Sequence, residues 1–127
     1  MKNAKAIKSE ILDLRDTFDL YEFSKRFHAF NMELSSIMIT ENWNKGGKNA
    51  NYITRLTTIL TDYNQYENKI PQQTCTKIRE DINYIQGMTE KLYNGSASVF
   101  CINNCKSHLD NIDRELSAIS EKRKRDS

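Results

Sequence analysis

The chain has 127 residues with one proline, four glycines and 28% charged side chains, a composition that favours helices over a turn-rich β fold. This length fits a single domain that can bury a core without help from disulfides or a metal. The net charge of +2 comes from the final EKRKRDS, because residues 1–120 hold 15 basic and 15 acidic side chains, and this balance argues against a broadly basic nucleic-acid surface.

Two apolar stripes with helical spacing occupy the first third of the chain, over residues 4–18 and 20–37. Phe18 and Leu20 point about 200° apart on a helix that turns 100° per residue, so one straight helix would bury opposite sides in its two halves. The residues between the stripes include three competent N-caps, which are Asp16, Thr17 and Asp19. A break near residues 16–19 is therefore predicted.

A loop is predicted next, because residues 40–51 have no apolar period and contain paired glycines. The stripe of a further helix begins at Ile53. That helix should end before Pro71, since the residue that precedes a proline is disfavoured in helical geometry. Pro71 then suits the first turn of the following helix.

The last two helices are predicted to form an antiparallel hairpin. Asn94 and Gly95 should end the first of them, and Ser96 or Ser98 should cap the second, whose stripe continues to Ile119. The chain as a whole is expected to be all-α, an antiparallel bundle of four to five amphipathic helices over residues 1–120. A disordered basic tail is expected over residues 121–127.

The motif CINNCKSH places Cys101, Cys105 and His108 within about 60° of arc on one helix, and thiolates with imidazole suit zinc. A fourth ligand is missing, because the hairpin would place Cys75 roughly 15 Å from Cys105 along the axis. Cys105 also falls on the apolar stripe, where a thiol packs as a small hydrophobe. We therefore expect core cysteines beside a surface histidine, with no metal and no cofactor.

His28, in SKRFHAFNMEL, invites comparison with the phosphorelay histidine of four-helix phosphotransfer domains. Those domains resemble one another in a histidine followed by a lysine and a small residue. Asn31 and Met32 stand three and four residues after His28, so the sequence favours a polar neighbour at the edge of the apolar stripe. Without a phosphate-binding glycine loop or a Glu-x-x-His pair, the chain is expected not to be an enzyme.

Trp43 is the only tryptophan and lies in the polar loop, where no apolar period can include it. It either folds back to cover the end of the bundle or projects as an anchor for a partner, because buried aromatic anchors dominate interface energetics. The second alternative predicts a partner-binding surface that consists of Trp43, Asn42, Asn44 and Tyr52.

The corner YNGSASVF resembles the turn of the WXG100-type helical hairpins that the type VII secretion system exports. The four matching positions are Tyr93, Gly95, Ala97 and Phe100. Tyr93 stands where that family has tryptophan. The resemblance implies an export-associated hairpin that acts with another helical protein.

These observations lead to the expectation of a small non-enzymatic protein of bacterial or phage type that binds one target protein, as an inhibitor, an immunity or antitoxin-like protein or a secretion partner. A weak nucleic-acid-binding accessory role, through Lys45, Lys48 and the basic tail, is the other alternative. Without a signal peptide or a membrane-length apolar run, a cytoplasmic location is expected. A homodimer remains open.

Overall fold

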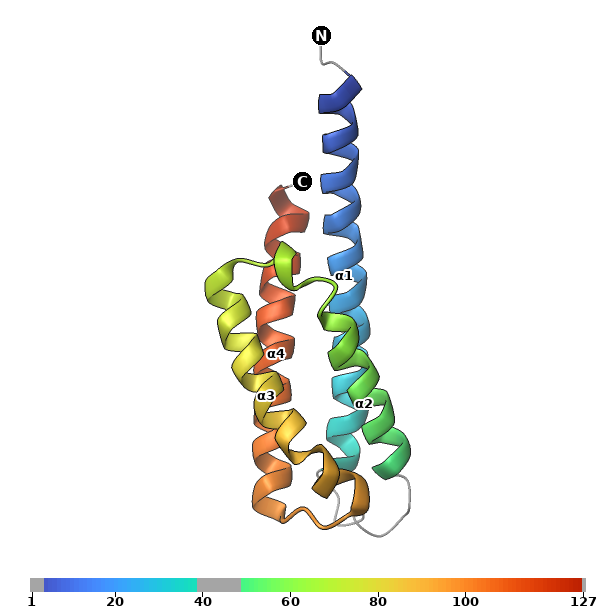
Figure 1. The fold of residues 1–127 in the computed structure, drawn as a ribbon, viewed down its shortest axis with the longest axis vertical. Coiled ribbons are helices and arrows are strands. Elements are labelled where there is room, and N and C mark those ends of the chain that lie inside the picture. The colour runs from blue at the N-terminus through green and yellow to red at the C-terminus, as the bar shows by residue number, and fades with distance from the viewer. Residues whose placement is uncertain (1–3, 39–48, 127) are drawn as a thin grey trace.

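The structure is a computed structural model that describes residues 4–38 and 49–126, with side chains described for 19–38 and 50–121 (Figure 1). It holds four α-helices in this part of the chain, and the short 3₁₀ helix η1 (Glu67–Lys69) lies between the second and third. The helices are α1 (Ala4–Met38), α2 (Asn49–Tyr63), α3 (Gln72–Asn94) and α4 (Val99–Asp126). The described ranges contain no strand, so the predicted all-α class is confirmed.

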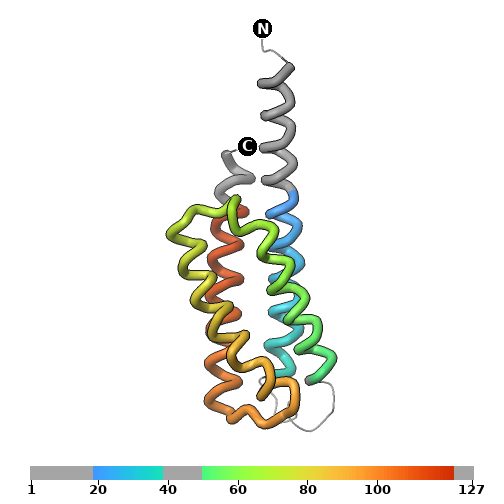
Figure 2. The backbone as a smooth tube through the Cα atoms, in the orientation of Figure 1, coloured from blue at the N-terminus to red at the C-terminus, as the bar shows by residue number. Residues whose placement is uncertain are grey.

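The four helices form a bundle in which successive helices run in opposite directions (Figure 1). The most extensive backbone contacts join α1 with α4, α3 with α4, and α2 with α3. The C-terminal end of α1, the N-terminal end of α2 and the corner between α3 and α4 lie at the same end of the bundle (Figure 2).

The predicted break near residues 16–19 is wrong, because α1 is one continuous helix of 35 residues. Its sequence contains neither glycine nor proline. Asp and Thr inside a helix cost at most about 0.7 kcal/mol each relative to Ala, too little to end a helix whose backbone hydrogen bonds continue on both sides. Residues that can serve as N-caps therefore lie inside a helix here.

The core contains the predicted apolar stripes from residue 20 onward. Each helix contributes its own set of buried side chains, and the fully buried ones include Leu20, Phe27, Leu34, Leu56, Leu60, Tyr63, Ile78, Ile82, Ile85, Leu92, Leu109, Ile112 and Leu116. Removing one of these larger aliphatic side chains from such a core costs about 2 to 5 kcal/mol.

The connection from α2 to α3 agrees with the prediction that a helix ends before Pro71, but α2 ends eight residues earlier and Pro71 is the N-cap of α3 and not part of its first turn. α2 ends at Tyr63, and Tyr66 in the next turn stacks on Phe23 of α1 with ring centroids 4.7 Å apart. Pro71 directly precedes Gln72, the first residue of α3, and its carbonyl accepts the first helical hydrogen bond, from the Cys75 amide at 2.9 Å.

The corner between α3 and α4 also forms where it was predicted. Gly95 has φ 77°, a left-handed conformation, and the carbonyl of Lys91 accepts hydrogen bonds from the backbone amides of Gly95, Ser96 and Ala97. Ser98 caps α4, since its Oγ accepts the amide of Cys101 at 3.2 Å.

The C-terminal end differs from the prediction. We expected the chain to leave the helix near residue 120, but α4 stays helical to Asp126. No glycine or proline follows Ser120, and the Lys and Arg residues there are good helix formers. The side chains after Glu121 lie outside the described residues.

Candidate functional site

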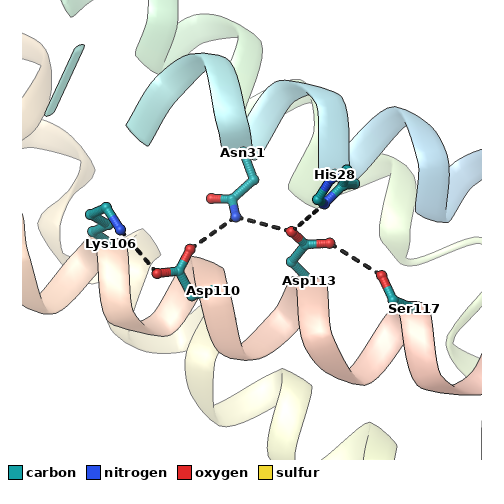
Figure 3. A network of polar contacts seen from close by, with 6 residues as sticks. All are labelled: His28, Asn31, Lys106, Asp110, Asp113 and Ser117. Carbon is teal, nitrogen blue, oxygen red and sulfur yellow. Dashed lines mark hydrogen bonds and ion pairs between the residues drawn. The ribbon is translucent and has the colours of Figure 1, made fainter. Parts of the chain in front are cut away.

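Polar side chains line the interface between α1 and α4, across from one another in antiparallel register (Figure 3). His28 Nδ1 lies 2.8 Å from Asp113 Oδ2, and the Asn31 side-chain amide donates to Asp110 Oδ1 at 3.0 Å. Lys106 forms an ion pair of 3.1 Å with Asp110. The network therefore joins the two helices through carboxylates of α4.

Asp113 is buried, and it is the centre of this network. Besides facing His28, its Oδ2 accepts a hydrogen bond from Asn31 Nδ2 at 3.2 Å, and its Oδ1 accepts one from Ser117 Oγ at 3.4 Å. The carboxylate of Asp113 thus accepts hydrogen bonds from side chains of both helices. Asn31 is itself 2% exposed, and its Oδ1 has no partner.

The buried polar residues of this interface recur every seven residues. Ser24 and Asn31 each lie four residues after a core residue of α1, and Asp113 and Ser120 do the same on α4. Four residues along a helix amount to a rotation of about 40°, so these side chains stand at one edge of each apolar stripe. That spacing is the signal that reasoning from the apolar stripes overlooked.

His28 stands at the rim of this interface with a 58% exposed side chain. It helps to line a shallow pocket of about 280 Å³ between α1 and α4. The other residues that line the pocket are Tyr21, Ser24, Lys25, Ser117, Ser120 and Glu121. Ser120 Oγ is buried there without a hydrogen-bond partner.

The second histidine forms a similar pair on another face. His108 Nδ1 lies 2.6 Å from Asp81 Oδ1 on α3, and its ring stacks on Tyr84 with centroids 4.2 Å apart. The sequence suggested that His108 is only a flanking surface residue. In the structure it joins α3 to α4 through a buried carboxylate.

The cysteines of CINNCKSH do not form a metal centre with His108. Cys105 is fully buried in the core, and burial, with a smaller effect of Cys101, raises the pKa of its thiol to about 11. Cys101 is partly buried. Among the described residues no group of three His, Cys, Asp or Glu side chains is placed to hold a metal ion.

A polar cluster joins the 3₁₀ helix η1 to α3. Arg79 donates from Nη2 to Glu67 Oε2 at 2.6 Å and from Nε to Glu67 Oε1 at 3.0 Å, and the Cys75 thiol donates to the same Oε1 at 3.1 Å. The Arg79 guanidinium, assisted by the thiol, holds the pKa of Glu67 below its usual range. Desolvation and the neighbouring carboxylate raise the pKa of Cys75, which makes it a poor nucleophile.

Tyr52 is the one residue of the predicted partner surface that the structure describes. It lies beside a groove of about 420 Å³ between α1 and α2, and its hydroxyl donates to Glu33 Oε1 at 3.3 Å. Arg55 binds the same carboxylate with two hydrogen bonds of 3.1 Å. Trp43, Asn42 and Asn44, and also Lys45 and Lys48, lie outside the described residues.

Three large apolar side chains that are exposed belong to residues at the corner between α3 and α4, and we call this set the corner patch. It consists of Tyr93, Val99 and Phe100, whose exposed fractions are 54%, 73% and 73%. Apart from Met32 on α1, which is 59% exposed, no other large apolar side chain in the described part of the chain is classed as exposed.

No protein-family model matches the chain, and neither a curated protein nor a solved structure is similar enough to match it. No helix in the described ranges combines the length and the apolar character that crossing a membrane requires.

Proposed function

We propose that the protein is a stoichiometric binder of another protein and that the corner patch is the centre of its contact surface. The observation that carries this proposal is the concentration of exposed apolar area at Tyr93, Val99 and Phe100, while the remaining large apolar side chains of the described bundle, Met32 aside, are at least partly covered. Exposed aromatic residues in such a group are typical of interaction sites.

The backbone of the corner supports this role because several hydrogen bonds define its conformation. Gly95 in its left-handed conformation, the three amides that converge on Lys91 and the Ser98 cap hold both helix ends in place. A preorganised patch loses little conformational entropy when it binds. The C-terminal end of α1 and the N-terminal end of α2 lie at this same end of the bundle (Figure 2).

Two of the exposed residues, Tyr93 and Phe100, are positions of the resemblance to exported helical hairpins. A secretion partner is therefore one form of the proposed binding, beside an inhibitor or an immunity-type protein. These forms share the contact surface and differ only in the class of the bound protein.

Photo-crosslinking tests the proposal. A benzoylphenylalanine replaces Phe100 in one variant and Met32 in a matched control, in cells that make the full chain. A protein that crosslinks from position 100 and not from position 32 is then purified and titrated calorimetrically. We expect one-to-one binding, weakened roughly 30-fold by Phe100→Ser because such anchors contribute about 2 kcal/mol.

Met32→Ser should leave the affinity unchanged, and neither variant should change the melting temperature appreciably, because both side chains are already exposed to water. Equal affinity of wild type and a Val99→Ser/Phe100→Ser variant for the crosslinked protein would contradict the proposal.

A further inference from the structure

The structure contains two histidines, each with its Nδ1 against a buried aspartate, and only one of the rings is open. His28 faces Asp113, and its side chain is 58% exposed. His108 faces Asp81, but Tyr84 covers a face of its ring and its side chain is 31% exposed. His28 is thus the reactive candidate, and His108 is an internal control that has the same kind of hydrogen-bond partner, a buried aspartate.

The environment of Asp113 determines which nitrogen of His28 is free. Asp113 already accepts hydrogen bonds from Asn31 and Ser117, so it acts as an acceptor toward the ring as well. The proton of the neutral ring is therefore on Nδ1, and Nε2 keeps its lone pair. A carboxylate that fixes the tautomer and supports positive charge on the ring makes the opposite nitrogen a better nucleophile.

The pocket beside His28 provides groups that suit a phosphoryl group. Lys25 lies one turn before His28 on α1 and belongs to the lining, and its Nζ stands over the Tyr21 ring, 5.1 Å from the centroid. Ser120 belongs to the same lining, but its Oγ is buried and has no hydrogen-bond partner among the described residues. Positioning and charge neutralisation supply most of the catalysis of phosphoryl transfer.

We propose that His28 is a phosphoacceptor that takes a phosphoryl group on Nε2 from a donor with a labile P–N or P–O bond. With phosphoramidate, whose nitrogen is protonated in its zwitterionic form, the Nε2 lone pair forms the new N–P bond while the P–N bond of the donor breaks, and the electron pair of that bond leaves with the nitrogen as ammonia. The ring proton stays on Nδ1 against Asp113, and nothing is oxidised or reduced.

The surroundings of His28 explain why the sequence argued against this role. The comparison with phosphotransfer domains required a lysine and a small residue after the histidine, where the chain has Asn31 and Met32. In the structure Asn31 points into the interface and binds Asp113, and the ammonium group comes from the preceding turn, at Lys25. Glu121 is the acidic group of the lining and opposes an incoming phosphate.

The site lies apart from the corner patch. Asp113 is 14 residues along α4 from Val99, which corresponds to about 21 Å of helix. Phosphorylation of His28 and protein binding at the corner can therefore succeed or fail independently.

The test treats the folded full-length protein with phosphoramidate and follows both histidines by mass spectrometry and ³¹P NMR under alkaline quench. We expect His28 to be labelled at least about tenfold faster than His108, since aligned groups commonly change such rates by that factor or more. We also expect the Nε2 isomer alone at His28. In concentrated urea the two histidines should react equally and give both isomers.

The proposal is overturned if the folded protein labels His28 no faster than His108, or if His28 yields both isomers in the native state. Variants sharpen the result without altering the core: Lys25→Gln should slow the labelling and Glu121→Gln should speed it. If Lys25→Gln speeded the labelling and Glu121→Gln slowed it, the phosphoryl group would not bind in this pocket. His28→Gln must abolish the fast phase, and His108→Gln must leave it unchanged.

Discussion

Asn31 on α1 lies directly across from Asp113 on α4, and its side-chain amide donates to that carboxylate at 3.2 Å from a position with almost no exposure to water. The same amide nitrogen donates to Asp110 at 3.0 Å. One neutral side chain thus serves two carboxylates on the facing helix. In this bundle the contact between its two longest helices depends on polar as well as apolar side chains.

Asn31→Leu should therefore destabilise the protein although leucine suits a helix and a core. The substitution removes the hydrogen bonds that Asn31 donates to Asp110 and to the buried Asp113, and a hydrogen bond typically contributes about 0.5 to 1.5 kcal/mol. Urea unfolding should show this loss as a lower midpoint at an unchanged slope.

The matched control is Asn51→Leu, which makes the same change at an exposed position of α2. That variant should unfold within about 0.5 kcal/mol of wild type. A loss at Asn31 no larger than the loss at Asn51 would mean that the hydrogen bonds of Asn31 contribute nothing measurable to stability.

The ion pair of Glu67 and Arg79 predicts that the protein becomes less stable as the pH falls. Because Arg79 lowers the pKa of Glu67 in the folded state, the carboxylate contributes stability that is fully present above its unfolded value of 4.5. This contribution disappears as the pH falls through the lowered folded pKa. Other carboxylates add to the same trend, so the effect has to be isolated by a variant.

Glu67→Gln should lose about 1 kcal/mol of unfolding free energy at pH 7. It should lose less at an acidic pH below the lowered folded pKa, where the wild-type carboxyl is protonated as well. Chemical denaturation at the two pH values measures the difference. An equal loss at both would show that Glu67 acts through packing and not through its charge.

Cys105 should resist alkylation in the native protein. Its thiol is fully buried and burial raises its pKa to about 11, so both access and the thiolate fraction are low. Timed iodoacetamide labelling at pH 8 with peptide mapping should find Cys105 modified at the rate of global unfolding. The urea-unfolded chain, in which all three cysteines should react alike, is the control; fast native labelling would place the thiol outside the core.

The apolar core could be predicted from the sequence because the spacing of apolar residues that produces it is local to each helix. Leu109, Ile112 and Leu116 follow one another at helical spacing, and a helix must bury such a stripe whatever lies opposite. The hairpin corner at Gly95 was predictable for the same reason, since a left-handed residue has few substitutes.

The polar network could not be predicted in the same way, because a side chain at the edge of a stripe is buried or exposed according to its neighbour. Asp113 becomes buried because α1 crosses above it with His28 and Asn31 in register. That register is a property of two segments more than 80 residues apart. The seven-residue recurrence of polar residues indicates the edge of an interface, but it does not say which helices meet there.

Replacement by alanine should have opposite effects on stability at the two described glycines, one inside α3 and one at its corner. At Gly95, φ of 77° is a conformation that an alanine reaches only at a cost of about 1 to 2 kcal/mol. Gly87 lies inside α3, and a methyl group added to it would meet no atom within 4 Å. Alanine there should stabilise the protein by about 0.5 to 1 kcal/mol, because glycine loses more backbone entropy when a helix forms.

Thermal unfolding of Gly95→Ala and Gly87→Ala, beside wild type, checks both signs in one experiment. Gly95→Ala should melt several degrees lower and Gly87→Ala a few degrees higher. Because the corner patch depends on the geometry of this turn, Gly95→Ala should also weaken binding of a corner-specific partner, whereas Gly87→Ala should not. If Gly95→Ala were as stable as wild type, the left-handed turn would be absent in solution and the rigid presentation of Val99 and Phe100 would be lost with it.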